Sequence, residues 1–295
     1  MKISIRDDLD LAKIASCGQT FRAALVETGV WRFVTGTHVL YLSADYADAQ
    51  RICEPGAAGP ADDPAGGNVL TGTWKASCDE ETWEAVWAPY FDLGRNYAAM
   101  RESIRRDNAY TEEVCENGRG IRILRQDPWE TLVTFIISQR RSIPAIRTCV
   151  EKLCASLGPA IRTERETLYL FPAPETVMEA PPETLAACGV GYRLPYIRDA
   201  AERVVSGALD LEGLEALSDE ELLDALRQVK GVGLKVAGCV ALFGYGRMAC
   251  APVDVWIARA IEEYFGGRDP FLSQGELAGL LQQYMFYYAQ QRKKS

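Results

Sequence analysis

The sequence predicts an α+β protein: an N-terminal α+β domain over residues 1–110, with an antiparallel β-sheet and helices, and then a mostly α-helical domain of two subdomains over 111–295. The sheet is indicated by two runs of β-branched and aromatic residues, 30–34 and 38–42, which a Thr-Gly-Thr turn separates as in a β-hairpin. The helical domain is indicated by apolar residues that recur at helical spacing from Ile121 onward.

Three further stretches complete the N-terminal domain. Residues 79–91 and 96–107 have helical patterns. Residues 54–68 are rich in Gly, Pro, Ala and Asp, a composition that predicts a flexible loop. The segment 16–22, Ser-Cys-Gly-Gln-Thr-Phe-Arg, is most simply interpreted as a turn between two strands.

Capping residues predict three helix starts in the C-terminal domain. Asp127 precedes a proline at the first helical position, and Glu130 follows at the third, a variant of the capping box. Ser218 and Glu221 repeat this signature further along the chain. Ser273 predicts the start of the last helix.

The composition is typical of a globular protein, with 48% hydrophobic residues in a chain of 295. No run approaches the roughly 18 apolar residues of a membrane span, and residues 1–11 mix charges with short apolar steps, unlike a signal peptide. The nine cysteines include no Cys-x-x-Cys pair and predict reduced, mostly buried thiols. We therefore expect a cytoplasmic protein.

The net charge of −9 argues against a nucleic-acid partner, because such proteins usually present a basic surface. The distribution of charge weakens this objection. Residues 119–147 hold six arginines against two acidic residues, a local excess of four positive charges. We expect these arginines to lie around a DNA-facing surface.

A turn between two helices holds the strongest chemical signal. A helix runs into Gly231-Val232-Gly233, and a second helix opens at once, with Lys235 in its first turn. The start of such a helix exposes backbone N–H groups and the positive end of the helix dipole, which together suit a phosphate. Nineteen residues after Lys235, Asp254 follows a Pro-Val pair at another predicted helix start. A lysine and a carboxylate at this spacing indicate chemistry on a nucleic acid.

This stretch resembles the helix-hairpin-helix DNA glycosylase superfamily and, within it, the bacterial 8-oxoguanine DNA glycosylases. The resemblance implies a base-excision repair enzyme that flips 8-oxoguanine out of duplex DNA, excises it, and nicks the strand by β-elimination. It implies that Lys235 is the nucleophile that forms a Schiff base, and that Asp254 is its electrostatic and acid–base partner. The active site would then lie in the cleft between the subdomains of residues 111–295.

The resemblance also implies a pocket for the extruded base. Gly18 begins a Gly-Gln-Thr-Phe-Arg segment like that of the family, in which the glycine carbonyl accepts the N7 hydrogen that only the oxidised base carries. Gln282 and Phe286 are four apart, so they share one helix face. The family pattern assigns Gln282 to the Watson–Crick edge of the base, with Phe286 and Cys239 on its two faces. The simpler interpretation makes Cys239 an ordinary core residue.

Two loops align with the parts of the family that contact DNA. Arg140 and Arg141 lie between two predicted helices, in the loop that fills the hole left by the base, although a solvated turn is the simpler reading. Tyr192 and Arg193 match the wedge that pries at the base stack and touches the opposite base. The family's asparagine is replaced by Arg140 and its cytosine-reading arginine by Ala145, which leaves the opposite-base preference open.

The hairpin itself is expected to bind the DNA backbone and an ion. The residues implied are Lys230, Gly231 and Gly233 for DNA, and the backbone carbonyls of Arg227, Val229 and Val232 for a structural monovalent cation. No cofactor is required by the family chemistry. We expect a monomer, located in the cytoplasm with the nucleoid, whose partner is double-stranded DNA containing an oxidised purine.

Two other functions fit part of the sequence. A monofunctional alkylpurine glycosylase of the 3-methyladenine type would typically use the aspartate alone; Lys235 argues against it, whereas Arg140 and Ala145 argue slightly for it. A non-catalytic helix-hairpin-helix module that only holds phosphate would not need Asp254.

Overall fold

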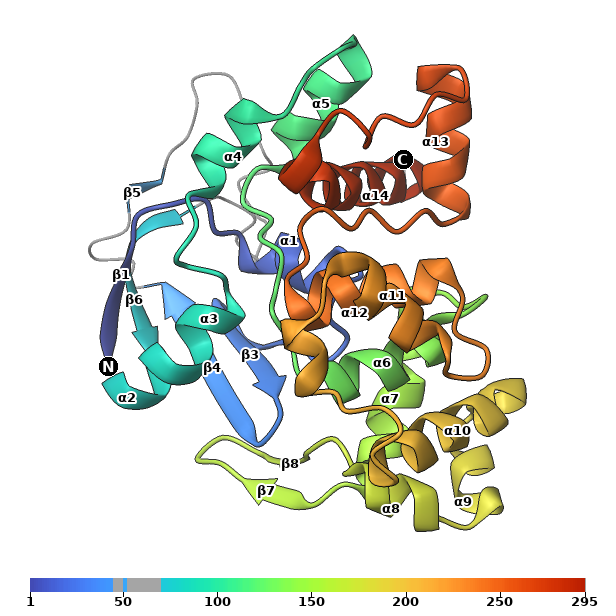
Figure 1. The fold of residues 1–295 in the computed structure, drawn as a ribbon. Helices are drawn as coiled ribbons and strands as arrows, with labels where there is room; N and C mark the ends of the chain where they lie inside the picture. Colours follow the sequence, from blue (N-terminus) through green and yellow to red (C-terminus); the bar gives the residue numbers. More distant parts are fainter. Residues whose placement is uncertain (45–49, 52–69, 295) are drawn as a thin grey trace. The chain divides into compact units, whose positions relative to one another are not determined.

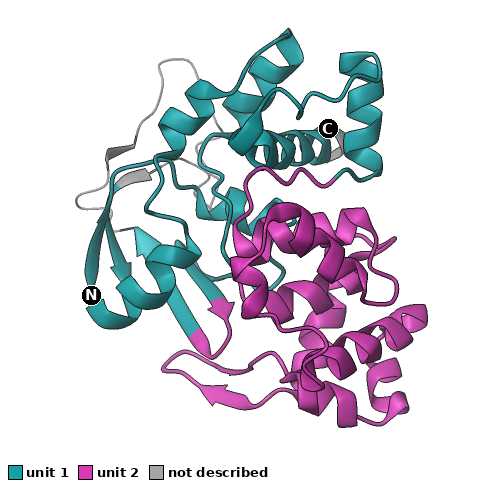
Figure 2. Cartoon of the chain, viewed as in Figure 1, with its two compact units in different colours: residues 1–33, 39–125, 253–295 teal, residues 34–38, 126–252 magenta. Residues whose placement is uncertain are grey.

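The computed structural model describes residues 1–44, 50–51 and 70–294. Within it the chain forms two compact units (Figure 2): unit 1 comprises residues 1–33, 39–125 and 253–295, and unit 2 comprises 34–38 and 126–252. The predicted division at residue 110 is different, because it assigns the whole C-terminal segment to the helical domain.

Packing explains why the C-terminal residues join unit 1. Helix α14 (Ala278–Lys294) packs on α5 (Ala109–Gly118) and on α13 (Val255–Phe265). Gly118 lies so close to the Tyr284 ring that a Cβ there would come within 2.3 Å of it. The contact depends on a glycine that nothing in the local pattern singles out.

Unit 1 contains the predicted antiparallel sheet (Figure 1), in the order β1-β6-β4-β3-β2 with β5 paired to β6. Its strands are β1 (Lys2–Ile5), β2 (Ala24–Glu27), β3 (Val30–Thr35), β4 (His38–Ala44), β5 (Gln50–Arg51) and β6 (Leu70–Ala76). The predicted hairpin is therefore confirmed as β3 and β4. The predicted loop 54–68 lies outside the described residues.

The helices predicted at 79–91 and 96–107 agree largely with the structure. The first corresponds to α2 (Glu80–Thr82), which continues through a π-helical turn (Trp83–Trp87) into α3 (Ala88–Tyr90), and the second to α4 (Tyr97–Ser103). Helix α1 (Leu11–Ser16) was not predicted. The prediction that Ser273 caps the last helix is wrong. Gly275, at φ +54°, interrupts the chain there, a 3₁₀ turn (Gly275–Leu277) follows, and the Ser273 hydroxyl donates to the Pro270 carbonyl instead.

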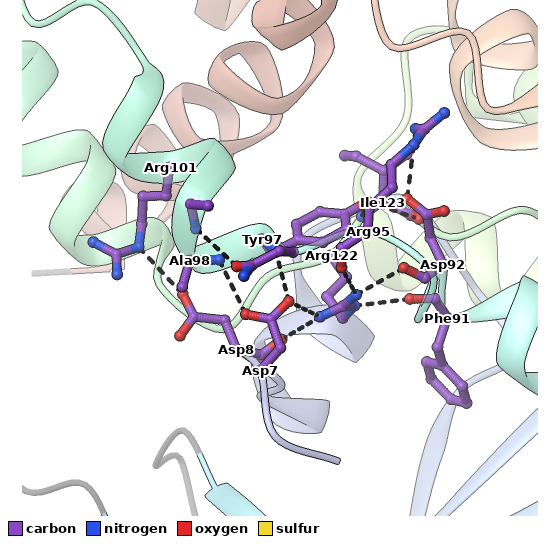
Figure 3. Close-up of polar contacts among 12 residues, drawn as sticks. Asp7, Asp8, Phe91, Asp92, Arg95, Tyr97, Ala98, Arg101, Arg122 and Ile123 are labelled. Atoms are coloured by element: carbon purple, nitrogen blue, oxygen red, sulfur yellow. Dashed lines mark hydrogen bonds and ion pairs between the residues drawn. The ribbon is translucent and has the colours of Figure 1, made fainter.

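One buried arginine ties the loops of unit 1 together (Figure 3). Arg122 is 0% exposed, and its guanidinium lies 4.1 Å from the centre of the Tyr97 ring. It donates hydrogen bonds to the Asp7 carboxylate and to the carbonyls of Asp8, Phe91, Asp92 and Arg95. The prediction that all the arginines of 119–147 lie on a DNA-facing surface is therefore wrong for Arg122, whose charge is used inside the fold.

Unit 2 is mostly helical, as predicted. Its helices are α6 (Pro128–Ser138), α7 (Ile143–Leu157), α8 (Pro174–Glu179), α9 (Pro182–Ala187), α10 (Leu194–Val205), α11 (Asp219–Arg227) and α12 (Leu234–Tyr245), and strands β7 (Ala160–Arg162) and β8 (Thr167–Tyr169) form a small antiparallel pair. The predicted caps are present: Asp127 accepts from the Glu130 N–H at 2.7 Å, and Ser218 and Glu221 form a complete capping box.

None of the described cysteines forms a disulfide, and all of them except Cys78 are buried, which confirms the prediction that they are mostly buried. Among the described residues, no helix is long and apolar enough to cross a membrane.

Candidate active site and nucleic-acid interface

The hairpin in unit 2 is shaped by one glycine. Gly231 has φ +78°, and a Cβ at this position would come within 2.3 Å of the Tyr196 ring, so only glycine fits. Gly233 then begins α12 with extended backbone and no side-chain cap among the described residues. The first N–H groups of α12 are therefore left for a ligand, as a phosphate site requires.

Lys235 is the second residue of α12 and is half-buried. Its Nζ lies 5.3 Å from the centre of the Phe135 ring, and that ring stacks on Phe243 with the centroids 5.5 Å apart. Cys239, one turn later on the same helix face, is 3% exposed. The Lys235 amine thus lies beside apolar side chains. It forms no salt bridge with a described carboxylate.

Helix α10 holds the first half of the hairpin. The backbone N–H of Lys230 donates to Asp199 at 2.7 Å, and Asp199 is also paired with Arg203 at 2.9 Å. The Lys230 side chain is exposed. Of the carbonyls expected to bind a cation, that of Val229 already accepts the Val232 N–H at 3.0 Å.

The two predicted DNA-contacting loops of unit 2 are braced against each other. Arg141 donates to the Gly189 carbonyl, and Arg193 donates to the Gln139 carbonyl. The Gln139 amide in turn donates to the Gly231 carbonyl at 3.3 Å. The structure therefore brings the loop 138–142, the wedge and the hairpin together within one unit.

The tips of these loops differ in exposure. Arg140 is exposed, has no partner among the described residues, and has a left-handed backbone with φ +54°, which is rare for a residue other than glycine. Tyr192 is 52% exposed, whereas Arg193 is 3% exposed. Arg193 stacks on Tyr192, with its guanidinium carbon 4.3 Å from the ring centre. In this structure Arg193 supports the Tyr192 ring. The contact of Arg193 with the opposite base stays a prediction.

Asp254 belongs to unit 1, where it caps α13 as predicted. Its Oδ1 accepts from the N–H groups of Trp256 and Ile257, both at 2.9 Å. The Oδ2 atom has no partner among the described residues. One carboxylate oxygen is thus fixed by the helix start, and the other is free for a ligand.

Three of the predicted base-pocket residues also lie in unit 1. Gln282 is 4% exposed, and its Oε1 has no hydrogen-bond partner among the described residues. Phe286 is half-buried one turn further along α14. Gly18 has φ +79°, and neither its N–H nor its carbonyl has a partner in the described part of the chain. Because helix α1 precedes Gly18, the simpler reading of a strand-to-strand turn is wrong.

Sequence reasoning missed two glutamines beside this pocket. The Gln19 amide donates to the Arg122 carbonyl at 2.8 Å and accepts from the Leu124 N–H at 2.8 Å. The Gln283 amide donates to the Cys17 carbonyl at 2.7 Å. Gln19 lies in the Gly-Gln-Thr-Phe-Arg segment, but its bracing role depends on burial, which is not visible in a sequence. No local signal marks Gln283.

No cluster of three or more His, Cys, Asp or Glu side chains suited to a metal ion occurs among the described residues.

Comparison with known proteins identifies the class. Residues 133–274 match the model of the HhH-GPD superfamily of base excision DNA repair proteins, and residues 2–132 match that of the N-terminal domain of 8-oxoguanine DNA glycosylase. A probable N-glycosylase/DNA lyase of Methanothermobacter thermautotrophicus is 29% identical over 71% of this chain and 74% of its own.

Two solved structures agree along nearly the whole chain. MBOgg1, determined in complex with a low-affinity DNA ligand, has 34% identity and a TM-score of 0.84, covering 99% of this chain and 96% of its own. The 8-oxoguanine glycosylase/lyase of Clostridium acetobutylicum, with DNA that carries cytosine opposite 8-oxoguanine, has 30% identity and a TM-score of 0.82, covering 97% and 93%. A 3-methyladenine DNA glycosylase of Archaeoglobus fulgidus, at 20% identity and a TM-score of 0.68, shares the fold alone.

The protein is thus a base-excision DNA repair enzyme of the helix-hairpin-helix superfamily. Within that superfamily the chain belongs to the 8-oxoguanine DNA glycosylase family, and it is a DNA glycosylase with associated lyase activity. These findings confirm the family and enzyme class predicted from the sequence, and they leave the alkylpurine enzymes as the more distant relatives.

Proposed function

We propose that this enzyme excises 8-oxoguanine from duplex DNA and then cleaves the strand by β-elimination. The observation that carries the choice of base is the buried Oε1 of Gln282, which lacks a donor among the described residues. An unpaired buried acceptor costs stability unless a ligand supplies the donor. The Watson–Crick edge of a guanine-type base offers two adjacent donors, N1–H and the N2 amino group, whereas that of adenine offers one donor, the N6 amino group, beside an acceptor at N1.

The free carbonyl of Gly18 supports the oxidised form of the base. At position 7, 8-oxoguanine carries an N–H, where guanine has only an acceptor nitrogen. A carbonyl placed there accepts from the first base and repels the second. Phe286 and Cys239 would supply the two faces of the slot, since a ring and a thiol both pack well on a purine.

Lys235 and Asp254 would carry the chemistry. The neutral amine of Lys235 attacks C1′ of the damaged nucleoside, and the bond to the base breaks with its electron pair leaving on the base. The free Oδ2 of Asp254 stabilises the positive charge that develops at C1′. Loss of the amine proton and opening of the sugar give a Schiff base. Removal of a C2′ proton then expels the 3′ phosphate.

The surface of unit 2 would hold the DNA. Arg140 and Tyr192, the exposed tips of the braced loops, enter the stack when the base leaves, with Arg141 and Arg193 as their supports. Lys230, Gly231 and Gly233 bind backbone phosphate, with a monovalent cation on the carbonyls of Arg227, Val229 and Val232. We propose a cytoplasmic, nucleoid-associated monomer that needs no cofactor for the chemistry.

The test is incubation of the wild-type protein with duplexes that carry 8-oxoguanine opposite each of the four bases, with and without borohydride. We expect excision, strand cleavage and a covalent adduct of protein and DNA after reduction. Duplexes with 3-methyladenine serve as the comparison. Efficient release of the methylated base, with 8-oxoguanine left intact and no adduct, contradicts the proposal.

A further inference from the structure

The Gly18 carbonyl is an isolated acceptor on a loop, yet the loop around it is tightly held. Gly18 itself makes no hydrogen bond in the described part of the chain, whereas both of its neighbours are fixed. Because an unsupported glycine at φ +79° is flexible, the direction of its carbonyl depends on the peptides on either side.

The residue after Gly18 is Gln19, and its own buried side chain fixes it in place. Gln19 is 1% exposed, and its amide bridges the Arg122 carbonyl and the Leu124 N–H, both at 2.8 Å. The Arg122 end of this bridge is rigid, since the Arg122 guanidinium has five acceptors of its own (Figure 3).

The residue before Gly18 is Cys17, and Gln283 fixes it in place. Gln283 is 2% exposed, and its amide donates to the Cys17 carbonyl at 2.7 Å, which sets the plane of the peptide that joins Cys17 to Gly18. The bond spans 266 positions of the sequence, so it is a tertiary contact and not part of the loop's own structure. Removing it leaves the buried Cys17 carbonyl unpaired and that peptide free to rotate.

Helix α14 thereby carries two neighbouring amides with different tasks. Gln282 presents a free acceptor, and Gln283, the next residue, holds the loop that presents the Gly18 carbonyl. Since both residues lie on α14, the helix that carries the Gln282 acceptor also holds the loop that carries the Gly18 carbonyl. Two acceptors held in this way read two edges of a single base more selectively than either does alone.

We infer that Gln283 is a positioning residue for lesion recognition: by holding the Cys17–Gly18 peptide it aims the Gly18 carbonyl at the N7 hydrogen of 8-oxoguanine. This inference rests on the proposed function. It assigns no contact between Gln283 and DNA, so the effect must appear in reactions that require the damaged base and be absent from those that do not.

The experiment compares two single-turnover reactions of the Gln283→Met variant: excision of 8-oxoguanine, and cleavage at a preformed abasic site, which holds no base to recognise. We expect excision to fall about tenfold, the value of one hydrogen bond, with abasic cleavage within about twofold of wild type. Gln274→Met is the matched control. Gln274 is also buried in unit 1 and also donates to a backbone carbonyl, that of Arg105 at 3.1 Å, and its loss should leave the ratio of the two reactions unchanged.

If Gln283→Met folds poorly, Gln283→Glu is used instead. It keeps the shape of the side chain and replaces the donating nitrogen with an oxygen. The ratio of excision to abasic-site cleavage is then measured in the same way. An equal loss in both reactions, or no loss in either, overturns the inference and leaves Gln283 a structural residue. A wild-type protein that cleaves abasic DNA but leaves 8-oxoguanine intact instead refutes the proposed lesion, and the inference with it.

Discussion

The two units position their functional residues by different physical means. In unit 1 the candidate base-reading atoms are held by buried polar side chains that act across long sequence separations, as in Gln19 to Arg122 and Gln283 to Cys17. In unit 2 Lys235 is placed by the backbone itself, through a glycine turn and a helix start. Unit 1 is therefore sensitive to the loss of single buried groups, and unit 2 to changes in backbone geometry.

The largest effect is expected at the catalytic lysine of unit 2. Lys235→Gln removes the only amine at that place on α12, so excision should fall by about a thousandfold or more, and no adduct should form with borohydride. Lys230→Gln, which changes an exposed lysine on the same hairpin, should weaken DNA binding yet still give the adduct. An adduct of normal yield with Lys235→Gln would show that another amine is the nucleophile.

The buried arginine of unit 1 should dominate stability. Arg122→Met removes the guanidinium that donates to the Asp7 carboxylate and to four carbonyls, so we expect a loss of about 3–5 kcal/mol in the free energy of unfolding by urea. Arg125→Met is the control at an exposed position and should change this free energy by about 0.5 kcal/mol at most. Similar values for the two variants would contradict the role assigned to the buried network.

Acid should weaken the same network, because protonation of Asp7 removes the charge that Arg122 and two backbone N–H groups stabilise. Burial by itself would raise the pKa of Asp7, but hydrogen bonds from the Tyr97 and Ala98 N–H groups and from Arg122 outweigh it and lower the pKa. The stability that this carboxylate contributes is thus present above its ordinary pKa of 3.8 and is lost as the pH falls through the lowered value.

Alanine substitutions at two glycines of unit 2 distinguish the cost of backbone strain from the cost of a steric clash. Gly231 and Gly207 have similar positive φ values, +78° and +76°, but only at Gly231 would a Cβ meet a neighbouring ring. Gly207→Ala should cost about 1–2 kcal/mol, the strain of a left-handed alanine. Gly231→Ala should cost about 3 kcal/mol, because the Tyr196 ring must also move, and it should weaken DNA binding. Equal thermal destabilisation of the two variants would show that the Tyr196 contact does not constrain the hairpin.

A smaller effect is expected from the thiol beside Gly18. Burial raises the pKa of Cys17 from 9.0 to about 11, so the folded state holds the proton more tightly. The stability this contributes is present below pH 9 and is lost as the pH rises toward 11, by about 2 kcal/mol at pH 10.5. This contribution is measured as the difference in the free energy of unfolding by urea between wild type and Cys17→Ala, from pH 7.5 to 10.5. Parallel pH profiles for the two proteins would rule out this contribution.

Much of unit 2 could be predicted because its signals are local. The caps at Asp127 and Ser218 and the hairpin glycines each involve residues within one turn of each other, and all were found where the sequence indicated. The helix start at Asp254 in unit 1 is an equally local signal and was found in the same way. A cap depends on short-range hydrogen bonds that the same few residues make in most contexts, so a pattern suffices to predict it.

The sequence by itself therefore determined the fold class, the hairpin and the residues that fit the family chemistry. Only the tertiary structure decided that Arg122 is buried within unit 1 rather than on the predicted basic surface, that the C-terminal helices join unit 1, and that Gln283 holds the loop before Gly18. The physical reason is that burial and long-range hydrogen bonds depend on which distant segments meet. A charged or amide side chain has the same local pattern whether water or a backbone carbonyl is its partner.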